Sequence, residues 1–346
     1  MDEIRIMYDL KAVANLDKIY KNRGLFSLNE NKQHIQYKMS DEQSFHIILN
    51  TGLTSKVLKS LQFHTYDFFK VGLEHFAQKQ DVEIVKAFFD ANFLFKNGKS
   101  HSIDRKEYIR KLNEQINHLK LFAPTLKSHF KRRKQKYSTV LKFAETIVDF
   151  VFAYIVANVL KISFLSAFRI LRQHQNIFLF YFHPIRHAKL AKSLENLKKI
   201  SNVNLDNDSM QLALARNLVV MGRDPLVATI CSSLINADKL LTSAVNRYFP
   251  VAETKRVCIE DVDIDGVSFK KGDIVSVNLL PAKDEEDFKP MGFGTGVHTC
   301  AGKRLAIWVL GLAEEILTQD EYANVVFDIN AKAIQEGAFM LYEEIL

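Results

Sequence analysis

Cysteine and proline are both scarce in this chain, which has three cysteines and six prolines in 346 residues. An odd number of widely spaced cysteines argues against a framework of disulfides and suits a reducing compartment. So few prolines leave long stretches free to form helices. The first residues have neither the basic nor the apolar segment that begins a secretory signal, so we expect no signal peptide and a cytoplasmic protein.

The chain also has no uninterrupted apolar run long enough to cross a bilayer as a helix. The nearest approach is 146–168, which Asp149, Asn158 and Lys161 interrupt, and this predicts a buried core helix in place of a membrane span. The formal net charge is +7, but the basic clusters are short and carry no interleaved aromatic residues, so no nucleic-acid partner is expected. No repeat or linker divides the chain, so we expect a single domain over residues 1–346.

Apolar spacing predicts a mainly helical protein with a few strands. Helices are expected at 55–61, 82–89, 104–121, 142–160, 190–200, 209–235 and 239–248. Strands are expected at 45–49, 256–259, 268–269 and 274–277. Asp265 and Gly266 form a strong hairpin-turn dipeptide, which the strands at 256–259 and 268–269 flank.

The most informative stretch is 293–306, in which three glycines and a cysteine precede an apolar helical run at 305–317. Glycine permits tight turns and close approach to a flat ligand. A cysteine at the start of a helix is favoured as thiolate by the helix dipole. Two simpler interpretations are a buried apolar cysteine and a phosphate-binding loop. The second would require Ser or Thr after Lys303, where this chain has Arg304.

The pattern F-G-x-G-x-H-x-C-x-G-x-x-L-A in this stretch resembles the haem-binding loop of the cytochrome P450 superfamily. The resemblance implies that Cys300 is the axial thiolate ligand of the iron of haem b, iron protoporphyrin IX. Phe293, Gly294 and Gly302 would then pack beside the thiolate and the cofactor. It also implies a large helical body with a small β-rich edge.

Basic residues elsewhere in the chain extend the resemblance. His101 and Arg105 match an H-x-x-x-R motif whose side chains hold a haem propionate in the family, and the i, i+4 spacing puts both on one helix face. Arg256 and His298 resemble the family's further partners for the propionates. Burying two carboxylates without such partners would be costly.

The helix expected at 209–235 resembles the family's helix on the distal side of the haem, with one departure. Gly222 and the acid Asp224 are retained, but Pro225 replaces the usual threonine. The proline should distort the helix and free the carbonyl of Met221, and Asp224 becomes the candidate for a proton relay. Arg223 either points to solvent or, as in some fatty-acid peroxygenases of the superfamily, faces a substrate carboxylate.

Two structural motifs of the family are reduced. The E-x-x-R motif reads Ala244-Val245-Asn246-Arg247, without its glutamate, and only 280–291 separates the last strand from the cysteine loop. The J helix and the meander are therefore expected to be reduced, with Arg247 pairing with an acid at 284–286.

These observations favour a haem-thiolate oxygenase acting on an apolar or aromatic small molecule. Its electrons would come from an external ferredoxin or flavodoxin docking near Lys289, Lys303 and Arg304. The alternatives are a peroxide-driven peroxygenase, a redox-independent isomerase or lyase, and a non-catalytic binding or recruitment protein of the same fold.

Overall fold

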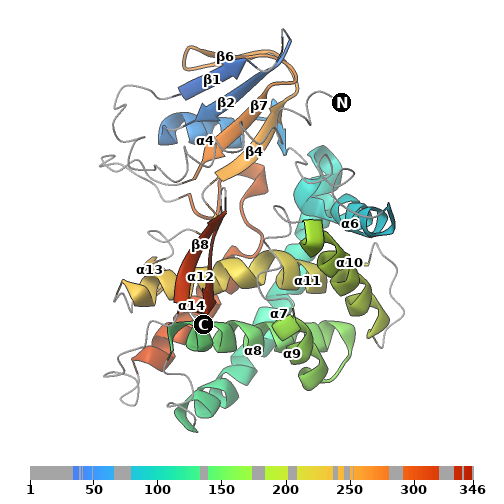
Figure 1. Ribbon diagram of the computed structural model, residues 1–346, viewed down its shortest axis with the longest axis vertical. Helices are drawn as coiled ribbons and strands as arrows, with labels where there is room; N and C mark the ends of the chain where they lie inside the picture. Colours follow the sequence, from blue (N-terminus) through green and yellow to red (C-terminus); the bar gives the residue numbers. More distant parts are fainter. Residues whose placement is uncertain are drawn as a thin grey trace.

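A computed structural model describes most of the chain, and Figure 1 shows a small sheet at one end and a helical body below it. The described residues are 34–38, 40, 42–48, 50–65, 79–132, 139–173, 184–201, 209–236, 241–244, 250–251, 253–279, 291–318, 331–336 and 339–344. Two hydrophobic cores follow the same division, one within the helical body and one beneath the sheet.

The helical body is built around α8 (Val140–Leu160). This helix is apolar on all sides, and most of its side chains are buried, as expected of a central core helix. It contacts α7 (Gly98–Arg132), α9 (Phe164–Gln173), α11 (Met210–Asn217), α12 (Arg223–Ile235) and α14 (Lys303–Leu317). The remaining described helices are α4 (Thr51–Lys59), α6 (Lys79–Ala91), α10 (Pro184–Lys199) and α13 (Leu241–Ala244), with 3-10 turns η1 (Phe93–Phe95) and η5 (Gly296–His298).

The main sheet has five described strands in the order β1-β2-β7-β4-β3. They are β1 (His34–Lys38), β2 (Ser44–Ile48), β3 (Phe63–Thr65), β4 (Glu253–Cys258) and β7 (Ile274–Asn278). β2 and β7 run parallel and the other pairs antiparallel. Arg256 on β4 pairs with Val275 on β7, so the strand order places this arginine inside the sheet.

Two small hairpins make up the rest of the described β structure. β5 (Val262–Ile264) pairs with β6 (Val267–Phe269) through a turn in which Asp265 and Gly266 both have positive φ. β8 (Ala331–Glu336) pairs with β9 (Phe339–Glu344), and this second hairpin crosses α12 and contacts it (Figure 1).

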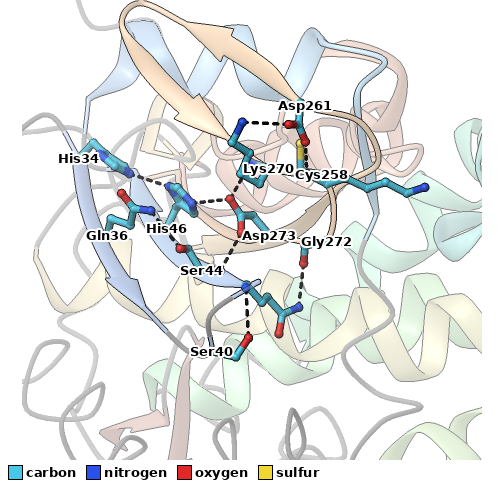
Figure 2. Close-up of polar contacts among 12 residues, drawn as sticks. His34, Gln36, Ser40, Ser44, His46, Cys258, Asp261, Lys270, Gly272 and Asp273 are labelled. Atoms are coloured by element: carbon cyan, nitrogen blue, oxygen red, sulfur yellow. Dashed lines mark hydrogen bonds and ion pairs between the residues drawn. The ribbon is translucent and has the colours of Figure 1, made fainter.

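A chain of side chains ties the edge of the main sheet to its interior (Figure 2). His34 Nε2 on β1 lies 2.8 Å from His46 Nδ1 on β2, and His46 Nε2 lies 2.9 Å from Asp273 Oδ2. Asp273 also accepts the backbone N–H groups of Ser44 and Lys270, each at 2.7 Å. Its buried carboxylate therefore joins the edge strands to the turn before β7.

The mainly helical fold with a small β region is confirmed, and most predicted elements are present with shifted ends. The strand predicted at 256–259 was placed in the wrong pairing. The Asp265-Gly266 turn joins β5 to β6, whereas Arg256–Cys258 belongs to β4 in the main sheet. In the main sheet β4 pairs with β7 on one side and β3 on the other. The strand that directly precedes the tight turn is instead 262–264.

Three further outcomes concern the reduced regions. Only 236–240 separates α12 from α13, which leaves room for little of a J helix. The meander at 280–290 and Arg247 lie outside the described residues, so the predicted pairing of Arg247 stays a prediction. Of the helix expected at 239–248, the structure describes 241–244.

Among the described residues, two helices are long and apolar enough to cross a membrane by length and composition, 140–160 and 210–235. In the apolar 18-residue stretch of each helix, 78% and 72% respectively is buried inside the protein. A core helix passes the same test, and the helical body surrounds both segments.

Candidate functional site

The cysteine loop at 291–302 lies between the two hydrophobic cores. Met291 packs into the core beneath the sheet, whereas Phe293 and Ala301 pack against the helical core. The loop is closed on itself, because the N–H of Cys300 donates to the carbonyl of Phe293 at 2.7 Å and the N–H of Gly294 to that of Met291 at 2.6 Å. Cys300 is therefore held by the backbone at the junction of the two parts of the fold.

Gly296 is the glycine that this arrangement most requires. Its φ is +72°, and a Cβ placed on it would lie 2.4 Å from the carbonyl oxygen of Leu58 on α4. No side chain fits at that distance. The cysteine loop thus lies directly against α4.

Cys300 is placed to be a thiolate ligand. The backbone N–H groups of Gly302 and Lys303, at the start of α14, act to lower the pKa of this thiol and so favour the charged form. Burial still raises the pKa of the thiol, against these two donors and Arg105. The residue nevertheless keeps exposed surface and is a free cysteine. An exposed cysteine can be reached by a ligand.

Four basic side chains that the sequence predicted as anchors gather beside this loop. The ring of His101 on α7 lies against that of His298, with centroids 4.1 Å apart. Arg105 Nη2 donates to the carbonyl of Thr299 at 2.6 Å. Arg256 on β4 is close enough to His298 to lower its pKa. Three elements distant in sequence thus contribute to one cluster.

The positive charge of the cluster is carried by its two arginines, which have few partners. Burial, together with His101, Arg256 and Arg105, lowers the pKa of His298 to about 3, and burial lowers the pKa of Arg256 to about 10. Arg256 donates to Thr254 Oγ1 at 2.8 Å and to the carbonyl of Lys255 at 2.7 Å. In the part of the chain that the structure describes, no carboxylate forms an ion pair with Arg256 or Arg105.

These features fit a flat cofactor that carries carboxylates and a metal. Arg256 is buried and has no anionic partner among the described residues. Cys300 is an exposed residue, and a Cβ on Gly302 would lie in ordinary contact with its sulfur, at 3.7 Å. Cys300 would hold the metal, and the four basic residues would hold the carboxylates. This is the set that the sequence motif predicted.

The predicted partner surface is described in part. Lys303 and Arg304 are exposed at the start of α14. Lys303 Nζ lies 5.6 Å from the centre of the Phe293 ring, and Arg304 donates to Asn113 Oδ1 at 3.0 Å. Lys289 lies outside the described residues.

The distal helix is distorted where the sequence predicted. Between α11 and α12 the backbone forms a π-helical segment, η4 (Leu218–Gly222), whose last bond joins the N–H of Arg223 to the carbonyl of Leu218. Pro225 follows within the first turn of α12, where its missing N–H is tolerated. Gly222 lies against α8, since a Cβ there would be 3.2 Å from the Phe152 ring.

The expectation that Arg223 points to solvent is wrong. Its side chain is 1% exposed and forms a two-point contact with Asp149 on α8, with Nε–Oδ1 2.7 Å and Nη2–Oδ2 3.2 Å. Nη1 donates to Asp224 Oδ1 at 2.8 Å and Nη2 to Glu145 Oε1 at 3.3 Å. An arginine whose donors are engaged by three carboxylates is not available to a substrate carboxylate. Asp224, the relay candidate, is itself bound by this arginine.

Sequence reasoning missed several buried polar residues in this region. Asn217, at the end of α11, is paired with Asn92 before η1, and the Tyr108 hydroxyl contacts Asn217. Glu145 and Asp149 face Arg223 from α8, and Arg172 on α9 reaches both. The signal for Asp149 was present, because it is a charge within a mostly apolar helix; nothing local identified its partner.

Comparison with known proteins places these features in context. No family model matches the chain. It is 33% identical over 96 residues to cytochrome P450 165C4 of Amycolatopsis orientalis, covering 23% of this chain and 24% of that protein. It is 28% identical over 127 residues to linalool 8-monooxygenase of Pseudomonas putida, covering 32% and 31%. The chain thus spans about a quarter to a third of the length of the curated relatives that it matches.

The likeness to solved structures covers almost the whole chain. P450BioI, solved in complex with an acyl carrier protein ligated to hexadec-9Z-enoic acid, superposes with a TM-score of 0.69 at 15% identity, over 94% of this chain and 98% of that one. At this identity the likeness shows the fold.

Proposed function

We propose that this chain, a divergent member of the cytochrome P450 superfamily, is a haem-thiolate oxygenase that oxidises an apolar or aromatic small molecule. The observation that carries the proposal is the basic cluster beside Cys300. Arg105, Arg256, His101 and His298 converge from α7, β4 and the cysteine loop, without a carboxylate ion pair to the two arginines among the described residues. Two haem propionates would supply the missing negative charge.

Each side of the site has a distinct part in this function. When bound, haem supplies the oxidative chemistry, and thiolate ligation favours O–O cleavage. Cys300 holds the iron, Phe293 and Gly294 cover the thiolate, and the residues before Pro225 form the oxygen side. Asp224 belongs to this stretch of helix, and Arg223 Nη1 donates to its Oδ1 at 2.8 Å.

A peroxide-driven reaction is the second candidate, and one observation favours it. Pro225 stands where the family has a hydroxyl that helps deliver protons, and a catalyst supplied with peroxide needs less from that relay. The contacts of Arg223 argue against the particular form in which this arginine binds a substrate carboxylate. The missing hydroxyl favours a redox-independent isomerase or lyase as much as a peroxygenase. The missing glutamate of the E-x-x-R motif and the short meander favour a non-catalytic binder, whereas the intact cysteine loop argues against one.

The first experiment is a titration of purified protein with haem, alongside Arg256→Met and Lys255→Met. Arg256 is buried in the cluster, whereas Lys255, its neighbour on β4, is paired with Glu253 at 2.6 Å and serves as the control. We expect one haem per chain, with affinity lowered at least about tenfold by Arg256→Met and little changed by Lys255→Met. Equal affinities in all three proteins would contradict the assignment.

The electron source is tested on the haem-loaded protein with a panel of apolar substrates. An acidic ferredoxin with its reductase is compared with hydrogen peroxide. The oxygenase proposal expects product with the ferredoxin and inhibition by salt, because the proposed docking residues Lys289, Lys303 and Arg304 are basic. Product with peroxide alone would favour the second candidate.

A further inference from the structure

The π-helical segment η4 is fixed at both ends by buried polar side chains. At its start, the amide of Asn217 pairs with that of Asn92, with Asn92 Nδ2–Asn217 Oδ1 2.5 Å. At its end, Arg223 is bound to Asp149 and Glu145 on α8. The five residues between, 218–222, carry the wider backbone turn.

A π-helical turn is an uncommon backbone state and persists where its surroundings impose it. Here both flanking residues are held by elements outside the helix. Asn92 lies between α6 and η1, and its Oδ1 also accepts the N–H of Leu94 at 3.1 Å. Asp149 is 0% exposed in the centre of α8. Neither contact is available to a helix that is one residue out of register.

The charges at the second end are unequal. Arg223 and Arg172 face three carboxylates, those of Asp149, Asp224 and Glu145. Burial alone would lower the pKa of Arg223, but Asp149 and Asp224 raise it, so the arginine stays charged. Burial raises the pKa of Glu145 against the pull of both arginines. Arg223 is the one cation of the group that is bonded to α8 and lies on α12.

We propose that Arg223 is a positioning residue, which together with Asn217 imposes the π-helical turn of the distal helix and orients the carboxylate of Asp224. The part of this proposal that rests on the proposed function is the role of the turn in shaping the oxygen side of the haem. A chain without the usual threonine would set its oxygen side through these two contacts, acting from outside the helix.

The test is hydrogen–deuterium exchange of the backbone amides at 218–222 in the haem-loaded protein. The variants are Arg223→Lys, which keeps the charge and loses the two-point contact, and Asn217→Ser. The control is Arg172→Gln, which removes a cation from the same group whose ion pairs, among the described residues, are to Glu145 and Asp149 on α8. We expect exchange of this segment to become about tenfold faster in the first two proteins and to stay at the wild-type rate in the control.

A second readout reports the oxygen side directly. The stretching frequency of carbon monoxide on the reduced iron senses the polarity opposite the thiolate. We expect it to shift in Arg223→Lys while the thiolate Soret band stays in place. In the double variant that combines Arg223→Lys with Asn217→Ser, the effects of the two substitutions on the exchange rate should not be additive, because both contacts act on the same five residues.

Two results would overturn the proposal. Exchange at 218–222 that matches Arg172→Gln would mean that Arg223 only neutralises buried acids. Exchange that rises uniformly over the whole protein would mean that it contributes stability alone. The same exchange can be measured in the protein without haem and without substrate, so failure of the proposed function would be seen separately, as absent haem or absent product.

Discussion

At the scale of single residues, the site depends on where the backbone places a few atoms. Cys300 receives two N–H groups because α14 begins directly after it, and Gly302 leaves the sulfur uncovered. Gly296 brings the loop against the carbonyl of Leu58. Each of these roles belongs to one position and can be tested by one substitution.

Gly296→Ala tests the close contact between the cysteine loop and α4. Its matched control is Gly98→Ala, since Gly98 has a similar φ of +68° but nothing within 4 Å of an added Cβ. The control should lose about 1 kcal/mol of unfolding free energy from backbone strain alone. Gly296→Ala should lose at least about 3 kcal/mol, because the clash adds to the strain. Denaturant unfolding measures both, and equal losses would contradict the contact.

Pro225→Thr tests the proton supply on the distal side. If electrons enter from a redox partner, the restored hydroxyl should raise the fraction of consumed electrons that reaches product. Product formed per NADH consumed, with the same ferredoxin, measures this coupling. Unchanged coupling or lost activity would favour the electron-independent candidate.

Residue patterns predicted part of this site for a physical reason. The cysteine loop and the i, i+4 pair of His101 and Arg105 have short-range spacing that a sequence displays directly. The contact of Arg223 with Asp149 joins residues 74 positions apart, and no local pattern encodes it. The structure was needed to move Arg223 from a surface or substrate-facing position into the core.

At the scale of helices and strands, the long apolar helices were predicted correctly. The predictions failed where the structure depends on which strands pair with each other. α8 and the helical stretch at 210–235 are long and apolar, so their presence was predictable. The partner of β4 was not, because a strand of six residues can pair with several neighbours. Short strands carry little periodic signal, and β1, β3, β5, β8 and β9 were missed. The ten-residue helix α9 was not predicted either.

The histidine chain at the sheet edge gives this part of the fold a dependence on pH. A carboxylate only accepts hydrogen bonds, so His46 Nε2 carries a proton toward Asp273 and Nδ1 of the neutral ring accepts from His34. Burial lowers the pKa of His46 although Asp273 opposes it, and burial with His46 lowers that of His34. Below the ordinary value of 6.5, the unfolded chain therefore binds more protons than the folded one.

It follows that stability is fully present above about pH 6.5 and is lost as pH falls below it. Denaturant unfolding between pH 7.5 and about pH 5 should show a loss of up to about 1.4 kcal/mol per pH unit for each such histidine. His46→Gln, which keeps a donor for Asp273, should have the shallower dependence. The lowered pKa values of His101 and His298 act in both proteins and cancel in the comparison. Equal slopes would refute the role of His46.

At the scale of the whole molecule, the site lies where the sheet and the helical body meet (Figure 1). The cysteine loop packs into both cores, and its four basic neighbours come from both parts. Binding a cofactor there would join the two cores through one group, so haem should stabilise the whole protein by mass action.

That stabilisation is itself a prediction. The midpoint of thermal unfolding should rise by several degrees when haem is added in excess of its dissociation constant, as expected for about 3 kcal/mol of linkage. Protein titrated with a metal-free porphyrin is the control, because it retains the propionates and lacks the bond to Cys300. A smaller rise with the metal-free porphyrin would measure the contribution of the basic anchors without that of the thiolate bond. No rise with haem would contradict the proposed site.

The central claim is that Cys300 binds haem iron as a thiolate at this junction. The measurement that tests it most directly is the absorption spectrum of the haem-loaded protein, reduced with dithionite under carbon monoxide. The account predicts the strongly red-shifted Soret band of a thiolate-bound iron, and its disappearance in Cys300→Ala. A carbonyl band at the position of a neutral ligand in the unmodified protein, or the red-shifted band retained in Cys300→Ala, would contradict it.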